Sequence, residues 1–93
     1  MSIYELFGLD GYSSTVQYDP TRPKWQQIAD VLRRRIDEGV YPAHHKLSEV
    51  QLEGEFEVAR ITMRKAIKAL RDEGRVVTTP GMGSFVTATE APD

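Results

Sequence analysis

Apolar residues recur at helical spacing in three stretches of the chain, and two β-prone runs follow the third. The first stripe consists of Trp25, Ile28, Ala29, Leu32 and Ile36. Glu38-Gly39 and the breaker Tyr41-Pro42 close it, so the pattern predicts a first helix between about Pro23 and Glu38.

A second, shorter helix is predicted to begin at Ser48. Leu52 and Phe56 lie four residues apart and share one face. Ser48 suits the N-cap position, and Gln51 stands three residues on, where a capping box places Glu or Gln.

The third helix is predicted to start near Ala59. Its inward stripe is Met63, Ala66, Ile67 and Leu70. The other side carries Arg60, Thr62, Arg64, Lys65, Lys68 and Arg71. Gly74 ends the helix, because glycine tolerates a left-handed C-terminal conformation.

After this helix, residues 75–79 and 84–87 read as two strands, and residues 80–83 between them supply glycines for a tight turn. Three helices followed by a hairpin predict an α+β fold, the winged helix-turn-helix with a two-stranded β-hairpin wing. Such a fold places one helix in the major groove of DNA. We assign residues 1–22 to an N-terminal arm of unknown role, 23–88 to this domain and 89–93 to a short C-terminal tail.

These residues resemble the GntR-type bacterial transcription regulators from about Pro23 to Val86. The family's opening motif is matched by residues 23–29, and its Leu-Pro-Ser-Glu turn by Leu47-Ser48-Glu49. The start of its recognition helix, Val-Ser-Arg-x-Thr-Val-Arg-x-Ala, is matched by residues 58–66. Its wing ends Gly-x-Gly-Thr-Phe-Val, and this chain has residues 81–86 there.

The resemblance implies duplex DNA as the partner and a set of contacting residues. We predict that these are Ser48, Arg60, Thr62, Arg64, Lys65, Gly81, Met82 and Gly83. The resemblance also suggests a chain that consists of the DNA-binding half alone, with no small-molecule effector domain evident. Because one small domain touches few base pairs and helix-turn-helix regulators gain affinity on two half-sites, we also expect a homodimer, at least on DNA.

The chain departs from the family pattern at several positions. Ala59 replaces the usual serine cap of the recognition helix, which costs about 0.5–2 kcal/mol. Val50 stands where a phosphate-contacting arginine is common. The wing carries Thr78-Thr79-Pro80 where relatives often have arginine, so we expect weaker phosphate attraction there.

The net charge of −2 argues at first against a nucleic-acid partner, but the charge is segregated. Residues 59–75 hold six basic and two acidic groups, a sum of +4, whereas residues 43–57 hold one basic and four acidic groups, a sum of −3. A local basic face sets the DNA footprint. The acidic second helix should repel phosphates, so we expect weak non-specific binding.

Two functions follow from these features. The first is a sequence-specific transcription regulator, a repressor that reads a short inverted repeat. The alternative is a winged-helix protein-interaction module that works through its aromatic N-terminal arm, which holds Ile3, Tyr4, Leu6, Phe7, Tyr12, Val16 and Tyr18.

Other chemistry finds little support in the sequence. Cysteine is absent, so disulfides and thiolate metal sites are excluded. His44 and His45 are adjacent loop residues that suit one metal ion poorly, and we expect neither a metal nor a cofactor. No set of nucleophile, base and orienting group indicates an enzyme. No membrane span or signal peptide is recognisable, so a cytoplasmic location is expected.

Overall fold

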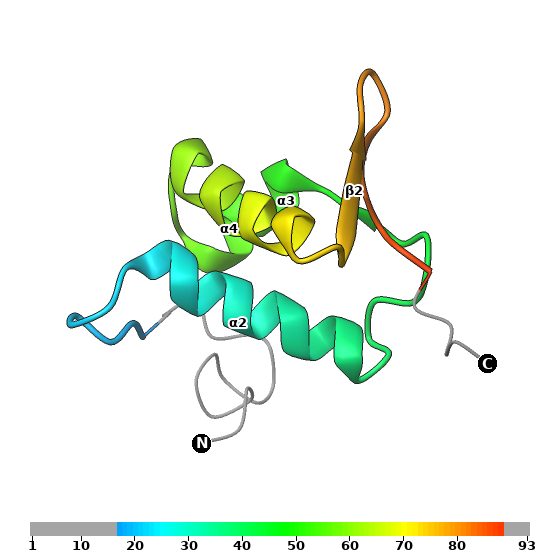
Figure 1. The fold of residues 1–93 in the computed structure, drawn as a ribbon. Helices are drawn as coiled ribbons and strands as arrows, with labels where there is room; N and C mark the ends of the chain where they lie inside the picture. Colours follow the sequence, from blue (N-terminus) through cyan, green and yellow to red (C-terminus); the bar gives the residue numbers. More distant parts are fainter. Residues whose placement is uncertain (1–16, 89–93) are drawn as a thin grey trace.

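The computed structural model describes residues 17–88. Its elements, in chain order, are α2 (Lys24–Asp37), β1 (Lys46–Leu47), α3 (Glu49–Phe56), α4 (Arg60–Asp72), β2 (Val76–Thr79) and β3 (Gly83–Val86). The predicted winged helix-turn-helix is confirmed. Figure 1 shows α2 and α4 as neighbouring helices, with α3 beside α4 and the β2–β3 hairpin projecting beyond them.

One hydrophobic core joins all these elements. The predicted inward stripes supply it, and Ile28, Leu32, Phe56, Met63 and Leu70 are each 0% exposed. Burying one such side chain stabilises the fold by about 1.5–3 kcal/mol. Because α4 packs against both α2 and α3, its apolar face is fixed and its opposite face stays in solvent.

The ends of α3 and α4 form as their sequences predict, with one addition. The Ser48 hydroxyl accepts a hydrogen bond from the backbone N–H of Gln51 at 3.2 Å, which satisfies one free donor at the start of α3. Gly74, just after α4, has φ +82°. Glu57 caps the end of α3 with φ +58°, a left-handed conformation that only a few non-glycine residues adopt.

The sheet has a third strand that the sequence pattern did not reveal. β1 pairs antiparallel with β3, so the strand order is β1-β3-β2. Leu47 in β1 is buried, and it faces Ser84 in the register of the pair. This short strand ties the segment before α3 to the base of the wing, so the wing and the helix-turn-helix form one unit.

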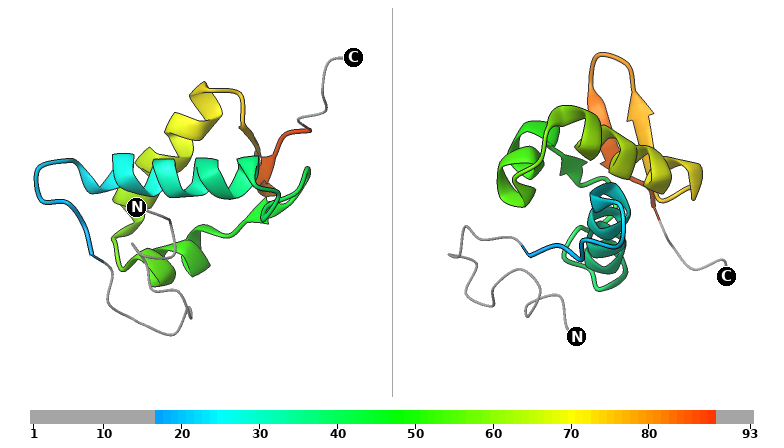
Figure 2. Two further views of the ribbon diagram at one scale, coloured as in Figure 1. Left: turned by 90° about the horizontal axis from the view of Figure 1, so that it is seen from below. Right: turned by 90° about the vertical axis from the view of Figure 1, so that its left-hand side faces the viewer.

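The wing itself is a hairpin whose tip stands clear of the helices. β2 and β3 pair from Val76 with Val86 to Thr79 with Gly83. The right-hand view of Figure 2 shows the tip extending past α3 and α4. A projecting tip of this kind is free to contact a partner that lies along α4.

Candidate nucleic-acid interface

The exposed side of α4 carries most of the predicted DNA contacts. Arg60 and Arg64, four residues apart, expose 61% and 63% of their side chains. Thr62 is half-buried and Lys65 is exposed. Ala59 takes the extended N-cap conformation but has no side-chain oxygen to accept a hydrogen bond, as its sequence predicts. The first five residues of α4 therefore present two arginines and a hydroxyl, next to a helix start that has no side-chain cap.

Two carboxylates on α3 hold the arginines of α4. Arg60 Nε lies 3.5 Å from Glu53 Oε2, and Arg64 Nε lies 3.4 Å from Glu49 Oε1. Glu53 Oε2 is buried and accepts no hydrogen bond within the described residues. The acidic helix thus neutralises the two arginines that are candidates for base reading.

Ser48 lies at the start of α3, one residue before the glutamate that meets Arg64. Its hydroxyl accepts the capping hydrogen bond from Gln51, and its side chain is half-buried. Ser48 therefore directly precedes the residue that pairs with Arg64, and its hydroxyl is already engaged as the cap of α3.

The wing tip brings the remaining predicted residues together. Met82 is 61% exposed, and its backbone N–H donates to the Thr79 carbonyl at 2.9 Å. Gly81 has φ +80° and Gly83 has φ +119°, conformations that side chains other than glycine rarely adopt. A Cβ on Gly83 would lie 2.9 Å from Lys46 Cε, whereas one on Gly81 would meet nothing within 4 Å.

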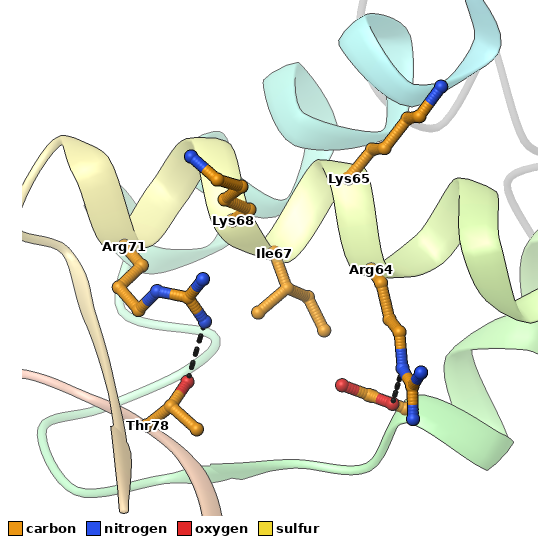
Figure 3. A pocket seen from close by; sticks show the side chains of 7 residues that line it. Arg64, Lys65, Ile67, Lys68, Arg71 and Thr78 are labelled. Atoms are coloured by element: carbon orange, nitrogen blue, oxygen red, sulfur yellow. Dashed lines mark hydrogen bonds and ion pairs between the residues drawn. The ribbon is translucent and has the colours of Figure 1, made fainter.

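A cavity of about 410 Å³ separates α4 from the first strand of the wing. Its lining includes Arg64 and Glu49 at one end and Arg71 and Thr78 at the other, with Ile67 between them (Figure 3). Lys65 and Lys68 also border it, and in Figure 3 both ammonium groups point away from its centre. The cavity is thus bordered by four cationic side chains and one carboxylate.

One surface residue of this region was missed by the sequence reasoning. Ile61 is 67% exposed on the first turn of α4, whereas Val50, which the family pattern already placed at a phosphate-contacting position, is 68% exposed on the first turn of α3. Ile61 falls outside the inward stripe of α4, and that position could have marked it as a surface residue. Arg71 and Thr78 could not be paired from sequence, because their contact depends on where the wing folds.

The end of the N-terminal arm is joined to the domain. The Tyr18 hydroxyl donates to the carbonyl of Phe56, the last residue of α3, at 2.6 Å. Burial raises the pKa of Tyr18 to about 12, and the nearby carboxylates of Glu57 and Glu55 add to the rise. The buried Gln27 side chain accepts from the Asp19 N–H and donates to the Asp19 carbonyl. The other aromatic and aliphatic residues of the predicted arm, in residues 1–16, lie outside the described residues.

The two histidines take no part in a metal-binding cluster of the described region. Across residues 17–88, no group of three or more His, Cys, Asp or Glu side chains is arranged to hold a metal ion. His45 stacks on Tyr41 with ring centroids 4.7 Å apart. A structural contact therefore occupies this histidine.

The fold and this surface define a class of protein, the winged helix-turn-helix DNA-binding proteins. Residues 24–86 match the model of the family described as "Bacterial regulatory proteins, gntR family". The chain belongs to this family. Residues 24–86 are therefore a DNA-binding domain of the kind found in these transcription regulators.

Similar proteins agree with this assignment. The chain is 32% identical over 65 residues to the histidine utilization repressor of Klebsiella aerogenes, covering 69% of this chain and 27% of that protein. It is 35% identical over 71 residues to the transcriptional regulator GmuR of Bacillus subtilis, covering 75% and 30%. The chain therefore spans about a quarter to a third of the length of these relatives.

Solved structures of the family include complexes with DNA. The DNA-binding domain of AraR in complex with operator ORX1 matches with a TM-score of 0.71 and 30% identity, over 77% of this chain and 93% of that one. A GntR family regulator from Listeria monocytogenes matches with a TM-score of 0.70 and 30% identity, over 75% and 62%.

Membrane insertion finds no structural support among the described residues. None of the helices in residues 17–88 is long and apolar enough to cross a bilayer.

Proposed function

We propose that this protein binds a specific operator through the first turn of α4 and represses transcription from it. The observation that carries the proposal is the exposure of Arg60 and Arg64 on one turn of a helix flanked by a projecting wing. Arginine reads guanine by a bidentate hydrogen bond to O6 and N7 in the major groove. The relatives named as repressors support the direction of regulation.

Ile61 extends the proposed contacts to an apolar group. It is 67% exposed and stands directly after Arg60 on the first turn of α4. An apolar side chain in the major groove contacts the C5 methyl group of thymine. We therefore include thymine next to guanine in the proposed half-site.

The proposed operator is a short inverted repeat bound by two copies of the protein. One small domain touches few base pairs, and helix-turn-helix proteins gain affinity by occupying two half-sites about one helical turn apart. The N-terminal arm is our first choice for the contact between copies, because its sequence holds aliphatic and aromatic residues such as Ile3 and Phe7, and apolar side chains of this kind favour contacts between proteins.

Selection from a random duplex pool tests the specific-binding proposal. The pool is bound at fixed salt, the retained duplexes are sequenced, and the best site is tested for repression when placed across a promoter. The expected result is a two-fold repeat containing guanine, with affinity that exceeds random duplexes by about a thousandfold or more. Retained duplexes without a common sequence would contradict the proposal.

Deletion of residues 1–16 tests the role of the arm. This boundary leaves Tyr18 and its hydrogen bond to α3 in place, so the domain keeps its described contacts. The expected result is a lower sedimentation mass or a loss of cooperative operator binding. An unchanged dimer, or a parent protein that is monomeric both free and on DNA, would remove the arm from the proposal. If the deletion variant binds the operator normally but no longer binds a partner protein that the parent binds, the result would favour the protein-interaction function.

A further inference from the structure

The wing of this protein carries no charge of its own. Residues 76–87, which include both strands and the tip, contain no Lys, Arg, Asp or Glu. A cation that attracts DNA phosphates to this hairpin must therefore come from another element.

Most cations of the chain are already paired with carboxylates. Of its twelve Lys and Arg residues, eight have a carboxylate oxygen within 4.0 Å in the described part of the chain. Four do not pair in this way among residues 17–88, and these are Lys24, Lys46, Lys65 and Arg71. Only Lys65 and Arg71 of these four border the cavity between α4 and β2.

Arg71 is held against the wing by a hydrogen-bonded chain. Its Nη1 donates to Thr78 Oγ1 at 3.1 Å, and Thr78 Oγ1 lies 2.9 Å from Ser84 Oγ. Ser84 is 4% exposed, so these hydrogen bonds end at a buried residue of β3. Figure 3 shows the guanidinium reaching from α4 across to Thr78 at one end of the cavity.

The fixed guanidinium keeps donors for a further ligand. A guanidinium has five N–H donors, and the described contacts of Arg71 use one of them. Its planar fork matches the geometry of phosphate oxygens. The neighbouring Lys68 is less available, because its ammonium lies 2.9 Å from the carboxylate of Asp72.

We propose that the cavity between α4 and β2 binds one backbone phosphate of duplex DNA, with Arg71 as its main ligand and Thr78 as a positioning residue. Arg71 and Thr78 lie at the opposite end of the cavity from Arg64, the residue proposed to read bases, and they supply the uncharged wing with a phosphate anchor. The inference rests on the proposed function in one respect only, that the ligand is DNA. A phosphate contact adds affinity without reading sequence.

The test compares Arg71→Gln with Arg34→Gln, which removes the same charge from an exposed position on α2. Affinity for the selected site and for a random duplex is measured across salt concentrations. The salt slope is the steepness with which the logarithm of the binding constant falls against the logarithm of the salt concentration. Loss of one phosphate contact lowers this slope by about 0.9, so between 50 and 200 mM salt the affinity of Arg71→Gln should fall ~3.5-fold less than that of the parent. At low salt, the affinity of Arg71→Gln should fall by the same factor for the selected site and for the random duplex.

The outcomes separate this proposal from the function on which it rests. Equal salt slopes for Arg71→Gln and Arg34→Gln would overturn the phosphate site even if the parent binds a specific operator. A parent that binds all duplexes equally would overturn specific reading, while the slope comparison would still decide the phosphate site. A parent that binds no duplex at low salt would overturn both.

Two further measurements test the role of Thr78 and the source of the phosphate. Thr78→Val should lower the salt slope although every charge remains, and Thr78→Ser should restore it, because serine keeps the hydroxyl that Arg71 contacts. Thr78→Val with the parent's slope would remove Thr78 from the site. Thermal unfolding with inorganic phosphate against chloride of equal ionic strength provides the other comparison. If phosphate stabilises the parent but not Arg71→Gln, and the salt slope of duplex binding is the same for both, the cavity would be a site for a free anion and the DNA proposal would be overturned.

Discussion

Arg64 of α4 and Glu49 of α3 face each other across the helix-turn-helix, with Nε and Oε1 3.4 Å apart. Arg60 and Glu53 repeat the arrangement at 3.5 Å. In the proposed reading of DNA, each arginine turns from its carboxylate towards a base edge and gives up that ion pair. Guanine supplies two acceptors to compensate for this loss, whereas a random sequence does not. The internal pairs therefore favour discrimination over non-specific attraction.

Glu49→Gln tests this relationship. Removal of the carboxylate frees Arg64 and deletes a negative charge from the DNA-facing side, so affinity for random duplexes should rise. An exposed ion pair is worth about 0.2–1 kcal/mol, which corresponds to a rise of up to about fivefold. The ratio of specific to random affinity, measured at one salt concentration, should fall. Glu38→Gln, at the C-cap of α2, is the control, and an identical rise in that variant would show a net-charge effect only.

The start of α4 has no side-chain cap, and this predicts a stabilising substitution at Ala59. Ala59 already has the extended N-cap conformation, with φ −73° and ψ 162°. Ala59→Ser adds a hydroxyl that can accept from a free backbone N–H of the first turn, so the free energy of unfolding should rise by about 0.5–2 kcal/mol. Urea unfolding measures it, with Ala43→Ser in the exposed loop as the control. No difference between these two variants would contradict a missing cap.

Substitutions at the wing tip distinguish turn geometry from close approach to DNA. Gly81→Ala places a Cβ in open space but at φ +80°, so it should cost about 1–2 kcal/mol of stability. Gly83→Ala should cost more, because its φ of +119° is less accessible to a residue with a Cβ. Close approach of the tip predicts that Gly81→Ala lowers DNA affinity beyond this loss of stability. Equal losses would assign both glycines to turn geometry alone.

The hydrogen bond from Tyr18 to the end of α3 predicts a dependence of stability on alkaline pH. Burial raises the folded pKa of Tyr18 to about 12, above its ordinary value of 10.0, so the protonated hydroxyl stabilises the fold fully below pH 10. That contribution is lost as pH rises from 10 towards 12. Tyr18→Phe should be less stable than the parent by about 0.5–1.5 kcal/mol at pH 8. The difference should shrink above pH 10, and a difference that stays constant to pH 12 would contradict the assignment.

The sequence predicted the helices, the hairpin and the exposed cations because each depends on local periodicity. The apolar stripe of Met63 and Leu70 determines which side of α4 is buried wherever the helix packs. β1 escaped prediction because a two-residue strand has no period of its own and forms only by pairing with Ser84 and Phe85 of β3.

Contacts between elements were beyond the sequence for a related reason. The ion pair of Arg60 with Glu53 and the hydrogen bond of Arg71 to Thr78 depend on the angles at which α3 and the wing meet α4. Spacing along the chain does not determine those angles. The sequence thus identified the cations of the surface, and the structure showed which of them are paired with carboxylates.

Base reading by Arg60 and Arg64 is tested by the double variant Arg60→Ala/Arg64→Ala. Affinity for the best duplex from the random pool is compared with affinity for random duplexes, for parent and variant at one salt concentration. Loss of each bidentate contact should cost about 1–3 kcal/mol at its own base position and relax the preference there. The account predicts a variant that stays folded and loses most of its discrimination. A variant that binds the best site as tightly as the parent would contradict it.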